Sequence, residues 1–184
     1  SEGSTWSAFQ VRDRVWVGEL RLDNTPAADQ QYSVEMMFGC ISSQTGLFRT
    51  QLADGIMGMS ANEYTLPWQM LSQGVVMQST FSLCLAEGGG TMTLGGADPL
   101  LAAAGPAAPI AWTQISKESG WFTVEVVDVA MGGESLGVSP SVFNAGKGTI
   151  VDSGTTDTYF PTGAAGSFKV RWKKLTGLDY KNSK

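Results

Sequence analysis

The sequence predicts an all-β protein. Its 23 glycines separate many short runs of β-forming residues, a pattern that is typical of strands joined by tight turns. Hydrophobic residues make up 42% of the chain, which is enough for a globular core. No run of about 18 apolar residues is present, so we expect no membrane segment in this chain. A length of 184 residues suits one ordinary domain or two partial ones.

The first elements follow from alternation of apolar and polar residues. Residues 5–17 have the pattern of a strand pair, with valines on one side and Arg12 and Arg14 on the other. Residues 22–31 are polar and contain a proline, which predicts a loop. Residues 32–38 are predicted to form a buried strand.

A short helix and a connection come next. Pro67 suits the first turn of a helix over residues 66–74, with Met70 and Leu71 as its apolar positions. Residues 100–109 are rich in Ala, Gly and Pro and are the natural candidate for a link between two parts of the chain.

A second helix is predicted near the end of the chain, over residues 164–175. Phe168, Trp172 and Leu175 share one face of it. Its basic residues are expected to form a solvated face rather than a binding patch: Lys169, Arg171, Lys173 and Lys174. Large aromatic side chains favour buried positions, so four tryptophans are expected to pack inside: Trp6, Trp16, Trp112 and Trp121.

Composition excludes several classes of function. The chain has no histidine, which removes Ser-His and Cys-His nucleophilic mechanisms and the commonest zinc ligand. We therefore expect no metal site and no cofactor. The net charge is −5 and no basic stripe is present, so nucleic-acid binding is not expected. Carboxylate chemistry remains.

The most informative stretch is residues 148–161. A short apolar run carries Asp152 to its end, and the turn Ser153-Gly154-Thr155 follows at once. Gly154 permits a tight reversal, and the two hydroxyls can donate hydrogen bonds that orient the Asp152 carboxylate. A carboxylate held in this way is available for chemistry. The alternative is a structural turn aspartate, with Thr155 capping the turn.

Together with the Thr-Tyr-Phe-Pro sequence that follows, this stretch resembles the second active-site loop of a pepsin-like aspartic protease. Further landmarks occur in the family's order and with about its spacing. They are Phe-Gly-Cys at 38–40, Ala-Asp-Gly-Ile-Met-Gly-Met at 53–59, Phe-Ser-Leu-Cys-Leu at 81–85, Thr-Met-Thr-Leu-Gly-Gly at 91–96 and Trp-Phe-Thr-Val-Glu-Val at 121–126. The chain is most similar to the plant and protist branch of the family.

The resemblance implies a partial bilobal acid protease fold with a few short helices. Residues 1–108 would be the C-terminal part of the N-terminal lobe, with a flap remnant and the interlobe link. Residues 109–184 would be the N-terminal part of the C-terminal lobe, with the second active-site loop. Asp152 is the only Asp in an Asp-(Ser/Thr)-Gly sequence. We therefore expect an internal fragment that lacks the first catalytic Asp loop and the C-terminal part.

The implied function is an aspartic endopeptidase, in which two aspartates share a proton and activate a water molecule. The chain supplies only one of them and is expected to be inactive alone, so the rest of the protease could come from a second chain. Substrates would be peptides or proteins. By resemblance, the residues bordering the substrate cleft are Thr156, Tyr159 and the flap residues Glu2, Gly3 and Ser4. The alternatives are a non-catalytic scaffold or assembly subunit, and an inhibitor-like peptide-binding module.

The chain has two cysteines, Cys40 and Cys84. They could be two buried free thiols, which are common in protein cores. The resemblance to plant-type proteases instead implies a Cys40–Cys84 disulfide. Such a bond would place the protein on the secretory route, in a vacuolar, lysosome-like or extracellular compartment. A membrane anchor would have to lie outside these residues.

Overall fold

A computed structural model describes residues 3–18, 28–98, 110–116 and 120–181. Strands outnumber helices in this part of the chain, and the helices are few, so the all-β prediction is confirmed. The chain divides into two compact units, residues 1–110 and 111–184. The predicted link over residues 100–109 lies outside the described residues. Assigning the two units to the two lobes of a protease remains a prediction.

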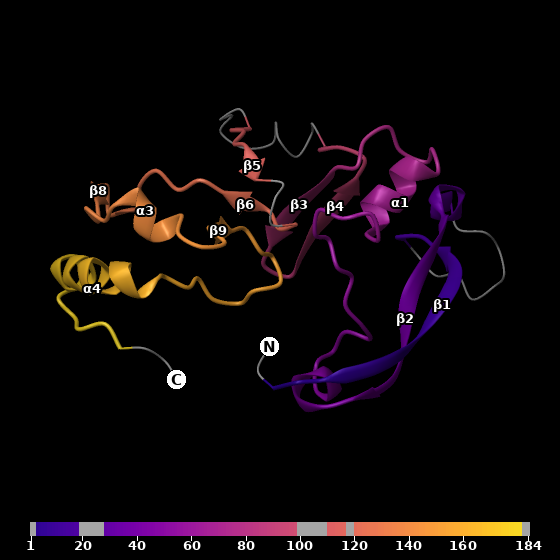
Figure 1. The fold of residues 1–184 in the computed structure, drawn as a ribbon, viewed down its shortest axis with the longest axis horizontal. Coiled ribbons are helices and arrows are strands. Elements are labelled where there is room, and N and C mark those ends of the chain that lie inside the picture. Colours follow the sequence, from indigo (N-terminus) through magenta and orange to yellow (C-terminus); the bar gives the residue numbers. More distant parts are fainter. Residues whose placement is uncertain (1–2, 19–27, 99–109, 117–119, 182–184) are drawn as a thin grey trace. The chain divides into compact units, whose positions relative to one another are not determined.

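The first unit begins with a long antiparallel ribbon. Strand β1 (Trp6–Val15) pairs with β2 (Val34–Gln44), and the register shifts between Ser7 and Ala8 (Figure 1). The predicted strand pair over residues 5–17 is therefore wrong, because this segment forms one strand of the ribbon and its partner comes later in the chain. The 3₁₀ helix η1 (Ala28–Tyr32) precedes β2, and η2 (Gly46–Arg49) follows it.

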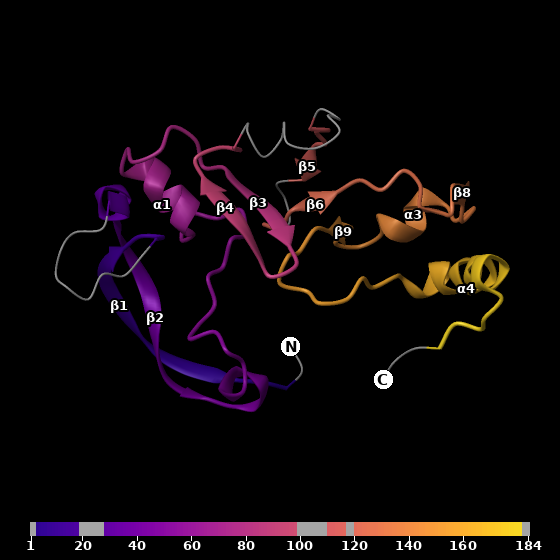
Figure 2. The ribbon, with the colours of Figure 1, turned by 180° about the vertical axis from the view of Figure 1, so that it is seen from behind.

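One short helix packs on one end of this ribbon. Helix α1 (Leu66–Ser72) has a proline in its first turn, where the missing N–H costs nothing. It buries Leu66 and Met70 against Val34 of β2, which makes the core of this unit. Figure 2 shows α1 and the β1–β2 ribbon from behind. The side-chain amide of Gln73 also binds both backbone groups of Glu35, at 3.0 and 2.8 Å. We call this arrangement an amide clamp.

A second hairpin completes the first unit. Strands β3 (Phe81–Ala86) and β4 (Gly89–Leu94) pair in an antiparallel register from Phe81↔Leu94 to Ala86↔Gly89. Leu94 packs partly against the core around Leu66.

Much of the β1–β2 ribbon is exposed. Val34 is buried, but Tyr32 is 51% and Phe38 41% exposed, so the predicted burial of residues 32–38 is confirmed only at Val34, which α1 covers. Trp6 lies at the other end of the ribbon and is exposed, and so are Trp112 and Trp121. The expectation that all four tryptophans are packed inside is therefore wrong.

The second unit is built on a small antiparallel sheet. Its strands lie in the order β5 (Ile115–Ser116), β6 (Thr123–Val124) and β9 (Thr149–Ile150). Helix α3 (Pro140–Phe143) lies between β6 and β9 in the sequence. Asn144, which follows α3, forms a second amide clamp, because its side chain binds the N–H and the carbonyl of Val126, both at 2.9 Å.

A tight hairpin and the longest helix make the rest of this unit. Strands β7 (Ala130–Met131) and β8 (Glu134–Ser135) are joined by Gly132 and Gly133, both with positive φ, as a type I′ turn requires. Helix α4 (Thr162–Thr176) covers the predicted helix over residues 164–175. Its inner face carries Phe168 and Trp172, which form an aromatic cluster with Phe160 and Tyr180.

Arg171 departs from the prediction for the basic residues of α4. Its side chain is buried, and its guanidinium donates to the carbonyls of Met131 and Gly132, at 2.9 and 3.4 Å, and to the carboxylate of Glu134. Arg171 therefore fixes α4 to the β7–β8 turn and is not part of a solvated face. Lys173 and Lys174 are exposed, as expected.

Candidate active site

The sheet of the second unit positions the loop that begins at Asp152. β9 pairs with the central strand β6, and one residue further the N–H of Val151 donates to the carbonyl of Phe122 at 3.0 Å. Asp152 is therefore the first residue beyond the hydrogen-bonded part of the strand. A residue in that place has a fixed backbone and a side chain that reaches solvent.

Two donors from the following turn fix the Asp152 carboxylate. The Thr155 hydroxyl donates to Oδ2 at 2.6 Å, and the Gly154 N–H donates to Oδ1 at 2.9 Å. The N–H of Thr155 closes the turn on the Asp152 carbonyl at 3.3 Å. Thr155 thus has the role that the sequence predicted, whereas the second donor is a backbone N–H and not the Ser153 hydroxyl.

The reason for glycine at 154 also differs from the expectation. Gly154 is not among the glycines with positive φ, so the turn does not need its conformational freedom. A Cβ at this position would instead lie 3.2 Å from Oδ1 of Asp152. Glycine lets the carboxylate approach the backbone N–H closely.

These hydrogen bonds favour the ionised form of the carboxylate. The Thr155 hydroxyl, and next the Gly154 N–H, lower the pKa of Asp152 below its usual value. The structure shows no ion pair between Asp152 and any basic side chain of the described residues. Asp152 is exposed, and its charge is free to act on a bound molecule.

We expect Thr155→Val to raise the pKa of Asp152, because valine keeps the shape of threonine but cannot donate to Oδ2. NMR titration of the Asp152 carboxyl carbon measures this directly. Ser153→Ala is the matched control and should leave the titration curve of Asp152 unchanged. A larger change from Ser153→Ala than from Thr155→Val would contradict the hydrogen-bond pattern of this turn.

Asp152 lines a hollow of about 820 Å³, which we call the Asp152 hollow. The loop after β9 forms one side of it, including Thr156, Tyr159 and Phe160. The other side includes Val142 and Phe143 of α3. The rest of the lining is mostly apolar and hydroxyl groups, with one further carboxylate at Asp157, and this composition suits a peptide or another molecule with mixed polarity. Thr156 and Tyr159, which the sequence placed at the cleft, both line this hollow.

Comparison with known proteins identifies the family. The model of the eukaryotic aspartyl protease family matches residues 3–175. The chain belongs to this family. An aspartic protease of Phaffia rhodozyma is 30% identical over 156 residues, 79% of this chain and 34% of the relative. Aspartic proteinase nepenthesin-2 of Nepenthes gracilis is 30% identical over 135 residues, 69% and 29% of the two chains. Aspartic protease 5 of Toxoplasma gondii is 36% identical over 111 residues, which are 58% of this chain and 11% of that relative.

The predictions of a pepsin-like aspartic protease and of its partial all-β fold are thus confirmed. The chain spans about a third of the length of the Phaffia relative and less of the two others. Matches to plant and protist proteins agree with the branch that the sequence indicated.

The residues that the resemblance assigns to the flap, Glu2, Gly3 and Ser4, belong to the first unit. Glu2 lies outside the described residues. Gly3 has a positive φ of 75°, and the Ser4 hydroxyl oxygen accepts a hydrogen bond from the N–H of Leu47 at 3.0 Å. Asp152 belongs to the other unit, so the cleft role of Glu2, Gly3 and Ser4 stays a prediction.

The predicted disulfide is not formed in the structure. Cys40 of β2 and Cys84 of β3 are both exposed free thiols, and their strands belong to two different sheets. Neither of the two sequence interpretations, a disulfide or a pair of buried thiols, describes this state.

Because both thiols are free and exposed, Cys40 and Cys84 should react with a thiol reagent without denaturant. Mass spectrometry of the labelled chain would then show two additions. A linked peptide pair containing Cys40 and Cys84, found without reduction, would instead support the disulfide.

Two further results concern metals and membranes. Among the described residues, no group of three or more His, Cys, Asp or Glu side chains is placed to hold a metal ion. Within the same part of the chain, no helix is both long and apolar enough to cross a membrane.

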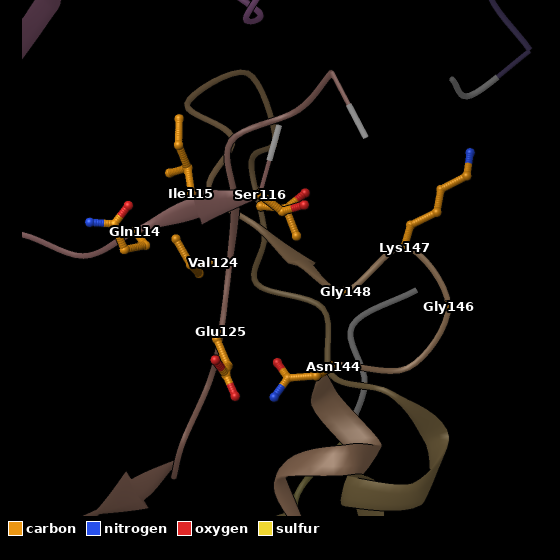
Figure 3. A pocket seen from close by; sticks show the side chains of 10 residues that line it. Gln114, Ile115, Ser116, Val124, Glu125, Asn144, Gly146, Lys147 and Gly148 are labelled. Carbon is orange, nitrogen blue, oxygen red and sulfur yellow. The ribbon is translucent and has the colours of Figure 1, made fainter. Parts of the chain in front are cut away.

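A second hollow, of about 410 Å³, lies beside the same sheet (Figure 3). Residues in or next to β5 and β6 and in the loop after α3 line it, among them Glu125, Asn144 and Lys147. The Asn144 amide is engaged in its clamp with Val126, and the Lys147 side chain points away from Glu125 and Asn144. This hollow lacks Asp152 and the turn that orients it, so the Asp152 hollow is the candidate active site.

Proposed function

We propose that this chain is part of an aspartic endopeptidase and that Asp152 is one of its two catalytic carboxylates. The observation that carries the proposal is the Asp152 carboxylate itself, which is exposed, lacks a basic partner among the described residues and is oriented by Thr155 and Gly154. Family membership over residues 3–175 supports the assignment.

The chemistry requires a second carboxylate. One ionised carboxylate acts as a general base on a water molecule, and a protonated one polarises the carbonyl of the peptide bond. Only Asp152 occurs in an Asp-(Ser/Thr)-Gly sequence among these 184 residues. The second aspartate would therefore come from sequence outside them, either in a longer protein or in a separate chain.

In this proposal the roles of the loop residues follow from their contacts. Thr155 and Gly154 favour the ionised form of Asp152, which suits a general base. Ser153 would support the loop, and Thr156 and Tyr159 would contact the substrate. The substrate would be an extended peptide, bound by strand-like hydrogen bonds in a secretory, vacuolar or extracellular compartment.

Peptide cleavage by the full-length protein tests the proposal. Cleavage of fluorogenic peptides is measured from pH 3 to 7, with and without a statine inhibitor that mimics the transition state. Cleavage that the inhibitor suppresses supports the endopeptidase. Failure to cleave and to bind statine would favour the alternative, a non-catalytic scaffold or assembly subunit.

A further inference from the structure

Asp152 is not the only carboxylate that lines its hollow. Asp157 lines the same hollow five residues later in the chain, in the bend that follows Thr155. No Lys or Arg belongs to the lining, so both of its charged side chains are acidic. Lys147 is close in sequence, but it is exposed and lines the other hollow.

The two carboxylates differ in what binds them. Asp152 accepts hydrogen bonds from Thr155 and Gly154. The structure shows no hydrogen bond or ion pair for Asp157 within the described residues. Asp157 is exposed at the wall of the hollow, so its charge is not used within the described part of the chain.

We propose that Asp157 determines specificity, by binding a cationic Lys or Arg side chain of the peptide in the Asp152 hollow. This inference rests on the proposed endopeptidase function and names the class of its substrates. A carboxylate without a partner attracts a guanidinium or ammonium group, and the attraction grows where the bound peptide excludes water. Tyr159 also lines the hollow and is 77% exposed, so its ring can also contact a cation.

The Asp152 hollow should also disfavour acidic side chains. A peptide with Asp or Glu at this place would bring a third negative charge beside Asp152 and Asp157, which disfavours binding. An uncharged side chain of the same length, such as norleucine, would lose the ion pair but would still contact Tyr159 and the apolar wall.

The test compares peptides that differ only in charge. A fluorogenic peptide is varied at each of four positions on either side of the cleaved bond, with Lys, norleucine or Glu. For the full-length protein we expect kcat/KM to be about threefold higher for Lys than for norleucine at one of these positions, as a single exposed charged contact predicts. The preference should fall as the salt concentration rises.

Three variants test whether Asp157 causes the preference for Lys over norleucine. Asp157→Asn should bring the Lys-to-norleucine ratio close to one, and Asp157→Lys should reverse the preference in favour of Glu. Asp179→Asn is the matched control, because Asp179 is an exposed acid of the same unit that pairs with Lys173 and does not line the hollow. The control should keep the ratio of the unchanged protein.

A binding measurement separates this inference from the proposed function. Asp152→Asn protein is titrated with the same peptides, and fluorescence anisotropy gives their dissociation constants. Charge-dependent binding without cleavage by the unchanged protein would overturn the endopeptidase and support the role of Asp157. Cleavage with equal kcat/KM for Lys and norleucine at every position would overturn the role of Asp157 and leave the endopeptidase standing.

Discussion

Asp152→Asn should reduce peptide cleavage by the full-length protein by at least about 10³-fold, because general acid–base catalysis contributes on that order. Asparagine has nearly the shape of aspartate and can still accept a hydrogen bond from Thr155. It cannot carry the negative charge that withdraws a proton from water. The measurement is kcat/KM for a fluorogenic peptide across pH 3 to 7.

The fold should survive this change. Asp152 is exposed and forms no ion pair with the described residues, so its replacement leaves no buried charge without a partner. Circular dichroism and a urea denaturation curve show whether the variant is folded. If the variant cleaves the peptide about as fast as the unchanged protein, Asp152 is not a catalytic residue.

The largest expected effect on stability comes from Arg171. We expect Arg171→Met to lower the free energy of unfolding by about 2 kcal/mol, the typical value for hydrogen bonds to a charged group. Methionine fills similar space, but it leaves the carbonyls of Met131 and Gly132 without the donors that Arg171 provides. Urea denaturation followed by fluorescence measures the change.

Lys173→Met on the same helix is the matched control. Lys173 pairs with Asp179 at 2.8 Å, and both side chains are more than 60% exposed, so the pair contributes less than about 1 kcal/mol. Equal losses of stability in the two variants would contradict the assigned role of Arg171.

The Arg171 effect should also depend on pH. Hydrogen bonds from Arg171, and next from Lys174, hold the pKa of Glu134 below its usual value. A carboxyl group with a lowered pKa in the folded state adds stability above its unfolded pKa of about 4.3, and this stability disappears as the pH falls through the folded value. The difference between the unchanged protein and Arg171→Met should therefore shrink in acid, while the contribution of the two carbonyls remains.

The turn at Asp152 shows how far local sequence predicts a site. The short strand, the turn and the hydroxyl of Thr155 lie within a few residues, and the structure has them as the sequence indicated. The N–H of Gly154 was missed because any residue but proline could supply it. The sequence offered a signal only in the glycine, whose lack of Cβ leaves room for the carboxylate.

Contacts between distant segments were predicted less well. The partner of β1 is a strand some twenty residues further along the chain, and nothing in residues 5–17 specifies it. Arg171 looked like its neighbours Lys169 and Lys173 on a basic helix. Its burial depends on carbonyls of a glycine turn about forty residues earlier, which no helical pattern reveals. Asp157 was visible in the sequence, but its place in the Asp152 hollow was not.

The two amide clamps have a consequence for tolerance of acid. Gln73 joins α1 to β2, and Asn144 joins the segment after α3 to Val126, in each case through a side chain that has no proton to gain or lose in the range where carboxylates titrate. These two joints therefore keep their hydrogen bonds at acidities that neutralise Glu134. As the pH falls, the ionic contacts of Glu134 with Arg171 and Lys174 of α4 would weaken before the hydrogen bonds of either amide clamp.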